Sequence, residues 1–303
     1  TQESNGGTIL LSLIASDRPR IMMNESSINF STLPKIKLSS IELAYIERGQ
    51  GPLVLCMHGF PDNACTWLPM LDVLAAQGYR AVAPFTRGYY PSPLAADGDY
   101  SLIALAQDVL DLIGALGEEK AIVIGHDWGG LSAITAANMV PEKISKLIVS
   151  GVPHLHKAPF SLAQLFRSWY VLLFQLPNLP EKLVGRKQLA LIDKFYAAWS
   201  PQWMIGSEHL DSVKSSLSAP GALSAALDYY RAMVRRMTSA RWKIISAKTT
   251  VPTLVFVGLA DGSTGHELFR YTKDCYENLR GLVKMTNVGH FPHIENHDLF
   301  ARK

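Results

Sequence analysis

Short apolar runs alternate with helical segments along most of this chain, and that alternation constrains the fold more than any other feature. Continuous apolar runs bounded by turn residues are typical of strands that are buried on both faces of a sheet. Strands joined by helices and short turns imply a parallel sheet with helices on both faces. The predicted strands are 52–59, 79–84, 120–125, 146–151, 251–258 and 282–288, and the predicted helices are 67–78, 101–117, 128–139, 264–278 and a last helix from residue 295.

The strand-and-helix pattern begins within 35–48, where apolar and polar residues alternate in two short runs. These two runs predict a pair of strands. The strand-and-helix pattern stops after residue 153, where aromatic-rich segments with helical periodicity replace the strand pattern. We therefore expect one α/β core that is interrupted by a helical insertion, or cap. The expected parts are an N-terminal arm of uncertain structure over 1–34, a core over 35–153 and 248–303, and a cap over 154–247, with helices near 162–175, 186–199 and 221–237.

The composition supports a globular chain and argues against a nucleic-acid partner. Hydrophobic residues make up 48% of the 303 residues, which is enough for a sizeable core. Lys and Arg number 29 against 26 Asp and Glu, and no basic run is interleaved with aromatic residues. Such a mild positive charge has no implication beyond solubility.

Two further features bear on location. The apolar run at 8–15 is too short to span a bilayer and lacks the basic start of a signal peptide, so no membrane span is expected. Cys56, Cys65 and Cys275 are few, odd in number and without CxxC spacing, which fits a reducing compartment. A Cys56–Cys65 disulfide is the less favoured alternative, because cytosolic disulfides are rare. We expect a cytoplasmic protein.

The motif "GHDWGG" at 125–130 is the first candidate for chemistry, because it follows an apolar strand and opens a predicted helix. Glycines at 125 and 129 permit a sharp turn that lifts residue 127 above the carboxyl end of the sheet. This pattern is a nucleophile elbow, more familiar with a serine at its centre. Here the central residue is Asp127.

A carboxylate at this position suits one kind of chemistry. It is ionised without the help of a base, and the helix N-terminus at 128 favours the anion. A carboxylate nucleophile attacks strained or activated sp³ carbons and forms an alkyl ester. The alternative is that Asp127 is only a helix N-cap, a position where Asp is common. The flanking glycines are more than a cap needs, so we favour the nucleophile.

Hydrolysis of such an ester requires a base and a group that orients it. His290 follows the last predicted strand in "NVGHFPHIE", and Asp261 follows the preceding strand in "VGLADGSTG". We expect them to be the base and its orienting acid. Asp62 and Asp108 are weaker candidates for the acid. The other histidines, His126, His154, His156, His266, His293 and His297 among them, are expected to be structural or exposed.

The motif "HGFP" at 58–61 follows another predicted strand and supplies an oxyanion hole. The backbone N–H groups of Phe60 and Trp128 are expected to converge on the Asp127 side chain. There they would stabilise the oxyanion that forms when water attacks the ester carbonyl.

Taken together, these motifs make the chain resemble an epoxide hydrolase of the α/β-hydrolase superfamily over about residues 35–300. The resemblance rests on "HGFPDNACTW", "RGYYPS", "GHDWGG", "GLADGSTG" and "GHFPHIE", and on the chain order of nucleophile, acid and base. It implies an α/β-hydrolase fold with a mostly parallel eight-stranded sheet, helices on both faces and an inserted helical lid. It also implies a small hydrophobic epoxide as substrate, with water as the only other reactant.

Two cap tyrosines of this family donate hydrogen bonds to the epoxide oxygen, and "RSWYVLLFQLP" and "GALSAALDYYRAM" are similar to the segments that carry them. The matching residues are Tyr170 and Tyr230, with Tyr229 as a competitor for the second place. The alternative is that these tyrosines only pack on the core. The resemblance adds His58, Pro61 and Trp128 to the expected substrate-binding set.

Three other functions were weighed against an epoxide hydrolase. A haloalkane dehalogenase would use the same nucleophile and Trp128, but Phe60 stands where the usual halide-binding Asn would be. A non-catalytic receptor of this fold would not need the three catalytic positions, and an esterase would need Ser at the elbow. No metal cluster, phosphate loop or dinucleotide fingerprint is visible, so no cofactor is expected. The oligomeric state is open, with a homodimer among the options.

Overall fold

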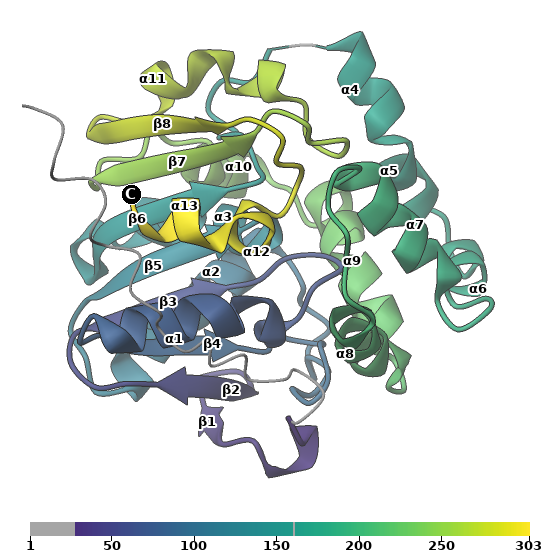
Figure 1. Ribbon diagram of the computed structural model, residues 1–303, viewed down its shortest axis with the longest axis horizontal. Coiled ribbons are helices and arrows are strands. Elements are labelled where there is room, and N and C mark those ends of the chain that lie inside the picture. Colours follow the sequence, from purple (N-terminus) through teal and green to yellow (C-terminus); the bar gives the residue numbers. More distant parts are fainter. Residues whose placement is uncertain (1–27, 160) are drawn as a thin grey trace, which may run out of the picture.

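The computed structural model describes residues 28–159 and 161–303. Its centre is an eight-stranded sheet in the order β1-β2-β4-β3-β5-β6-β7-β8 (Figure 1). Strands β1 and β2 run antiparallel to their neighbours, and the other six are parallel. The strands are β1 (Lys35–Lys37), β2 (Glu42–Arg48), β3 (Leu53–Met57), β4 (Arg80–Pro84), β5 (Ala121–His126), β6 (Ile144–Ser150), β7 (Thr253–Gly258) and β8 (Leu279–Met285).

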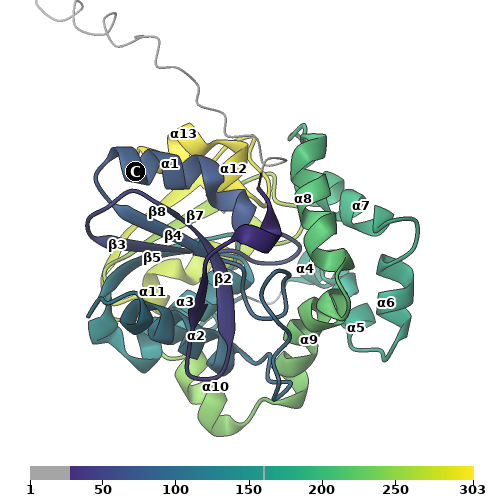
Figure 2. The ribbon, with the colours of Figure 1, turned by 90° about the horizontal axis from the view of Figure 1, so that it is seen from below.

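Helices cover both faces of the sheet, as Figure 2 shows in a view along its plane. One face carries α1 (Leu68–Ala76), α12 (Pro292–Glu295) and α13 (His297–Ala301), and the other carries α2 (Leu102–Ala115), α3 (Trp128–Met139) and α11 (Thr272–Cys275). Buried Leu, Ile and Val side chains form a separate hydrophobic core on each side. The prediction of an α/β-hydrolase fold with a mostly parallel sheet is therefore confirmed.

The predicted helix signals act as expected in α2. The Ser101 hydroxyl accepts a hydrogen bond from the backbone N–H of Ala104, which caps the first turn. The helix ends before Gly117, which has a φ of +86°. Within residues 28–159 and 161–303 the core also contains the 3₁₀ turns η2 (Phe30–Thr32), η3 (Ala64–Trp67), η4 (Pro141–Lys143) and η5 (His266–Tyr271).

The cap is inserted between β6 and β7, beyond the carboxyl ends of the parallel strands (Figure 1). A third core, rich in aromatic rings, joins the cap to the loops of the sheet. No strand lies in the described part of this insertion. Its helices are α4 (Leu162–Arg167), α5 (Trp169–Phe174), α6 (Leu179–Val184), α7 (Ala190–Trp199), α8 (Ser207–Ser218), α9 (Ala222–Arg235) and α10 (Ser239–Ile245).

Several predicted boundaries are wrong. The helix expected over 264–278 is instead the 3₁₀ turn η5 followed by the single turn α11. Strand β8 begins three residues before the predicted 282, because backbone pairing with β7 extends it through side chains that are only partly buried. The helix expected from 295 is instead two short helices, α12 ending at Glu295 and α13 beginning at His297, and the helix expected over 162–175 is broken at Ser168.

Most of the predicted N-terminal arm, and with it the apolar run at 8–15, lies outside the described residues. None of the helices in 28–159 and 161–303 combines the length and the apolar content needed to cross a bilayer. Cys56, Cys65 and Cys275 are buried and none of them is in a disulfide, so the alternative Cys56–Cys65 disulfide does not form.

Candidate active site

Asp127 sits at a strained turn between β5 and α3. Its φ of +51° is rare for a residue with a side chain. A Cβ at Gly125 would lie 2.4 Å from the Gly129 carbonyl oxygen, and one at Gly129 would lie 2.2 Å from that of Met57. The turn therefore requires glycine at both positions. Although Asp127 occupies the N-cap position of α3, its side chain makes no capping hydrogen bond.

The structure brings Asp127, His290 and Asp261 together in a line. His290 Nε2 lies 3.8 Å from Asp127 Oδ2, and His290 Nδ1 lies 2.9 Å from Asp261 Oδ2. The other Asp261 oxygen accepts hydrogen bonds from the backbone N–H groups of Ser263 and Thr264, at 2.7 and 2.8 Å. These bonds fix the carboxylate, and the carboxylate in turn fixes the orientation of the imidazole.

Burial and neighbouring charges shift the pKa values of Asp127 and His290. Burial raises the pKa of Asp127, outweighing the His290 ring and the backbone amides of Trp128 and Phe60, which favour the anion. The anion is less stabilised than a carboxylate in water, which favours its use as a nucleophile. Burial opposes protonation of His290, but Asp261, Asp127 and Glu295 more than offset it and raise its pKa to about 8.

The loop after β3 provides the donor expected for an oxyanion hole. The backbone N–H of Phe60 donates to Asp127 Oδ1 at 2.9 Å. A Cβ at Gly59 would lie 2.5 Å from the Asp127 side chain, so the loop approaches this closely only because residue 59 is glycine. Both ring nitrogens of the buried His58 bond within the protein, to the Gly59 carbonyl and the Thr86 amide, and so hold the loop.

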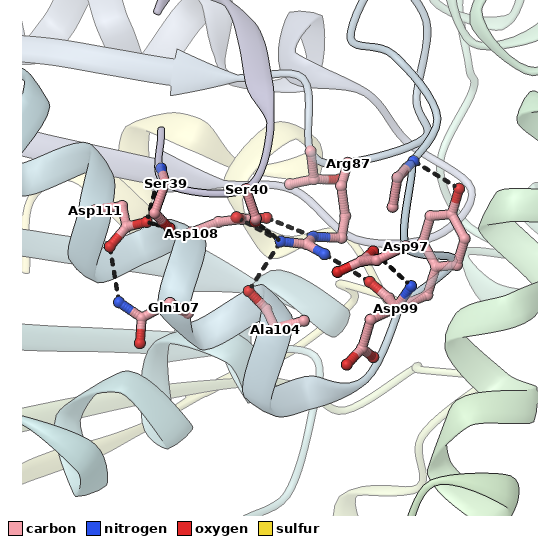
Figure 3. Close-up of polar contacts among 12 residues, drawn as sticks. Ser39, Ser40, Arg87, Asp97, Asp99, Ala104, Gln107, Asp108 and Asp111 are labelled. Carbon is pink, nitrogen blue, oxygen red and sulfur yellow. Dashed lines mark hydrogen bonds and ion pairs between the residues drawn. The ribbon is translucent and has the colours of Figure 1, made fainter. Parts of the chain in front are cut away.

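The weaker candidates for the orienting acid are engaged elsewhere. Asp62 accepts hydrogen bonds from Tyr196 and, at 2.9 Å, from His209. Asp108 forms a buried ion pair with Arg87, shown in Figure 3, with both of its oxygens on the guanidinium at 2.6 and 2.7 Å. Neither carboxylate is paired with His290, whereas Asp261 is.

Tyr170 on α5 and Tyr230 on α9 lie side by side, with ring centroids 6.0 Å apart. Tyr230 also packs edge-on against Phe60 and Trp128, the two residues whose amides flank the Asp127 carboxylate. Burial raises the pKa of both tyrosines, and the charge of Asp127 raises both further. Tyr229 points elsewhere, since its hydroxyl donates to the Arg87 carbonyl at 2.8 Å. Of the two neighbouring tyrosines, Tyr230 is therefore the one that lies beside Asp127.

A strained elbow, a three-residue relay and an inserted cap occur together in one fold family. The protein family described as the alpha/beta hydrolase fold matches residues 52–296 of this chain. The chain belongs to the α/β-hydrolase family. Its relatives include Epoxide hydrolase 4 of Mus musculus, which is 30% identical over 94% of this chain and 81% of the relative. An epoxide hydrolase of Caballeronia sordidicola is 30% identical over 84% of this chain and 87% of the relative. The expected family is thus confirmed.

Solved structures agree with this α/β-hydrolase in fold. An epoxide hydrolase from an endophytic Streptomyces is 25% identical, with a TM-score of 0.77 over 89% of this chain and 92% of that structure. The epoxide hydrolase of Bacillus megaterium with a bound inhibitor is 23% identical, with a TM-score of 0.79 over 89% and 97%. At that identity the second likeness shows the fold alone.

Several residues that hold the site of this α/β-hydrolase were not predicted. Glu295 accepts hydrogen bonds from the backbone N–H groups of Gly289 and Phe291, on either side of His290. It also accepts one from Ser200, at the end of cap helix α7. Ser263 bonds to the Tyr170 hydroxyl at 3.0 Å. Ser200 and Glu295 are 95 residues apart and Tyr170 and Ser263 are 93 apart, so no spacing rule could have joined these two pairs.

One buried group in this α/β-hydrolase has the side chains of a metal site. Asp62, His126 and His293 each direct one ligand atom at the others, with all three atoms within 4.8 Å. The atoms without a hydrogen-bond partner in the described chain include Asp62 Oδ2, His126 Nδ1 and His293 Nδ1. His126 Nε2 bonds to the His290 carbonyl at 2.8 Å, so this group of three residues is in direct contact with the His290 loop. Its chemistry would suit a divalent cation.

Proposed function

We propose that this α/β-hydrolase converts a small hydrophobic epoxide into a vicinal diol. The observation that carries the proposal is the position of Tyr170 and Tyr230 beside a largely buried Asp127 that faces His290. The names of its relatives support the same reaction. Water is the second reactant, and the mechanism requires no cofactor.

In the first step, a carboxylate oxygen of Asp127 attacks an epoxide carbon. The carbon–oxygen bond of the ring breaks, and the oxygen that leaves takes a proton from a tyrosine hydroxyl. Because burial raises their pKa, Tyr170 and Tyr230 stay protonated at neutral pH and act as donors. Ser263 can donate to the Tyr170 oxygen, which leaves the Tyr170 proton free for the substrate.

In the second step, water attacks the carbonyl carbon of the Asp127 ester. His290 takes a proton from the water, and Asp261 stabilises the imidazolium that results. The Phe60 and Trp128 amides stabilise the oxyanion. When the ester carbon–oxygen bond breaks, the leaving diol oxygen takes the proton held by His290. The proton of the new Asp127 carboxyl group returns to the tyrosinate left by the first step, so Asp127 is again a carboxylate and the tyrosine is again protonated.

A haloalkane dehalogenase is the competing function, because it would form the same ester on Asp127. A departing halide needs hydrogen-bond donors but no proton. The paired tyrosine hydroxyls are therefore more useful to an alkoxide than to a halide.

The experiment uses His290→Gln, which cannot activate water. With an epoxide in excess, intact-mass analysis is expected to show one adduct, on the peptide that contains Asp127. The wild type is expected to release diol from epoxides and no halide from haloalkanes, and Asp127→Ala to do neither. An adduct on another peptide would contradict the nucleophile, and halide release without diol would establish the dehalogenase.

A further inference from the structure

Helices α4 and α5 expose the wrong kind of side chain for a helix on a protein surface. The outward residues of this segment are large and apolar, with Phe166 78% exposed, Leu172 65% and Leu162 64%. Surface helices normally turn this face toward the core. We call the set the apolar ridge; it consists of Leu162, Leu165, Phe166, Trp169, Leu172 and Leu176.

The polar residues of the same segment point inward and bind the core domain. The Gln164 amide donates to the Ser263 carbonyl and accepts from the Gly265 amide, both at 2.8 Å. Arg167 forms an ion pair with Glu267 at 2.6 Å. The segment is thus anchored by its polar side, and the orientation of its apolar side is fixed. An apolar stripe held outward in this way indicates a surface that is covered by something else.

The charge beside the apolar ridge identifies what covers it. Lys182, Arg186 and Lys187 follow the ridge in sequence and are exposed, and no ion pair in the described part of the chain neutralises them. Glu181, the acid next to them, is paired with Arg231. Both α5 and α6 pack on α9, and Figure 1 shows α5 and α6 on the outer side of α9, away from the sheet.

Leu, Phe and Trp side chains beside a cluster of unpaired cations form the pattern of a helix that lies in the interface of an anionic membrane. A second copy of the chain fits less well. A two-fold dimer through the ridge would bring the two cationic clusters to the same interface, where they repel each other. We propose that the apolar ridge docks on the surface of an anionic lipid bilayer, without crossing it. This inference does not depend on the proposed reaction.

The test is co-sedimentation of the whole chain with phosphatidylcholine vesicles, with and without phosphatidylserine. The wild type is expected to bind the vesicles that contain phosphatidylserine and to bind phosphatidylcholine alone at least about tenfold more weakly. Phe166→Glu/Leu172→Glu is expected to lose binding to both. Lys182→Gln/Arg186→Gln/Lys187→Gln is expected to lose only the preference for phosphatidylserine. Met204→Glu, at a 95% exposed residue outside the ridge, is the matched control and is expected to bind as the wild type does.

Circular dichroism establishes that each variant is folded, which is expected because every changed side chain is exposed. Wild type that binds neither kind of vesicle would overturn the proposal, as would Phe166→Glu/Leu172→Glu that binds like the wild type. Analytical ultracentrifugation without lipid tests whether a second copy of the chain covers the ridge instead. A dimer that Phe166→Glu/Leu172→Glu dissociates would assign the ridge to a second copy of the chain and overturn membrane docking.

Discussion

At the scale of single residues, the site is a balance between burial and charge around Asp127. Burial makes the carboxylate a less stable anion, while the imidazole of His290 and two backbone amides restore part of that stability. The same carboxylate helps to raise the pKa of His290 to about 8. Asp127 and His290 therefore shift each other's pKa, and a reaction that removes the charge of one changes the pKa of the other.

This coupling predicts the pH dependence of the two steps. Water activation needs neutral His290, so hydrolysis of the ester is expected to slow as the pH falls. Esterification removes the charge of Asp127, one of the causes of the raised pKa of His290. As the pH rises, the rate of ester hydrolysis is therefore expected to reach its plateau with an apparent pKa below 8, whereas an NMR titration of His290 in the free enzyme is expected to give a pKa of about 8. Single-turnover kinetics measures the first quantity, and an ester whose hydrolysis is independent of pH would exclude His290 as the base.

The tyrosine hydroxyls give a second prediction at this scale. Tyr170→Phe/Tyr230→Phe is expected to slow formation of the Asp127 ester by roughly a hundredfold, the usual effect of losing an oxyanion donor. Each single change is expected to be milder, since the remaining tyrosine still donates. Tyr229→Phe is the control, because that hydroxyl bonds to the Arg87 carbonyl instead. Pre-steady-state alkylation measures the rates. A double variant with the wild-type rate would reduce both tyrosines to packing residues.

At the scale of elements, one ion pair joins the loop after β4 to helix α2. The Arg87 guanidinium lies between Asp108, the Asp99 carbonyl and Ser40, all drawn in Figure 3. The Arg87 carbonyl in turn accepts the hydrogen bond from Tyr229 of cap helix α9. The pair thus holds a loop that supports both the sheet edge and the cap.

Removing one partner of this pair leaves a buried charge without compensation. Asp108→Ala is expected to lower the free energy of unfolding by about 3 to 5 kcal/mol, as measured by denaturant titration. Asp111→Ala, three residues along the same helix, loses contacts with Ser39 and Gln107 near the surface. That control is expected to cost about 1 kcal/mol or less. Equal losses of unfolding free energy in the two variants would show that the buried Arg87–Asp108 pair contributes no more to stability than the surface contacts of Asp111.

Elements with a strong local pattern could be predicted from the sequence, and long-range contacts could not. Helix α3 has the predicted bounds, because the glycines of the elbow define its start. The sequence could place Asp127, His290 and Asp261 at one edge of the sheet, because each follows a strand. It could not join Glu295 to Ser200 or Ser263 to Tyr170, since only the fold brings these pairs together. The apolar ridge was also missed, because helical periodicity does not tell which face of α4 is outward.

At the scale of the whole molecule, the cap is bonded directly to the loops that carry Asp261 and His290. The Trp199 carbonyl, at the end of cap helix α7, accepts hydrogen bonds from the amides of Gly262 and His290, both at 3.1 Å. The Ser200 hydroxyl accepts a further bond from the His290 amide at 3.0 Å. One end of a cap helix therefore positions both the loop of the acid and the loop of the base.

Gly262→Ala tests this junction by adding a single methyl group. A Cβ at this position would lie 2.0 Å from the Ala198 carbonyl oxygen, a backbone atom of α7 that cannot rotate away. The cap helix and the Asp261 loop must then separate, which is expected to cost about 1 to 3 kcal/mol of stability. Turnover is expected to fall by up to about a hundredfold, because Asp261 no longer orients His290. Gly114→Ala is the matched control: its Cβ meets nothing within 4 Å in helix α2, so that variant is expected to be as active as the wild type and slightly more stable. Steady-state kinetics and thermal unfolding of both variants decide the matter, since a fully active Gly262→Ala would show that the relay is positioned without the cap.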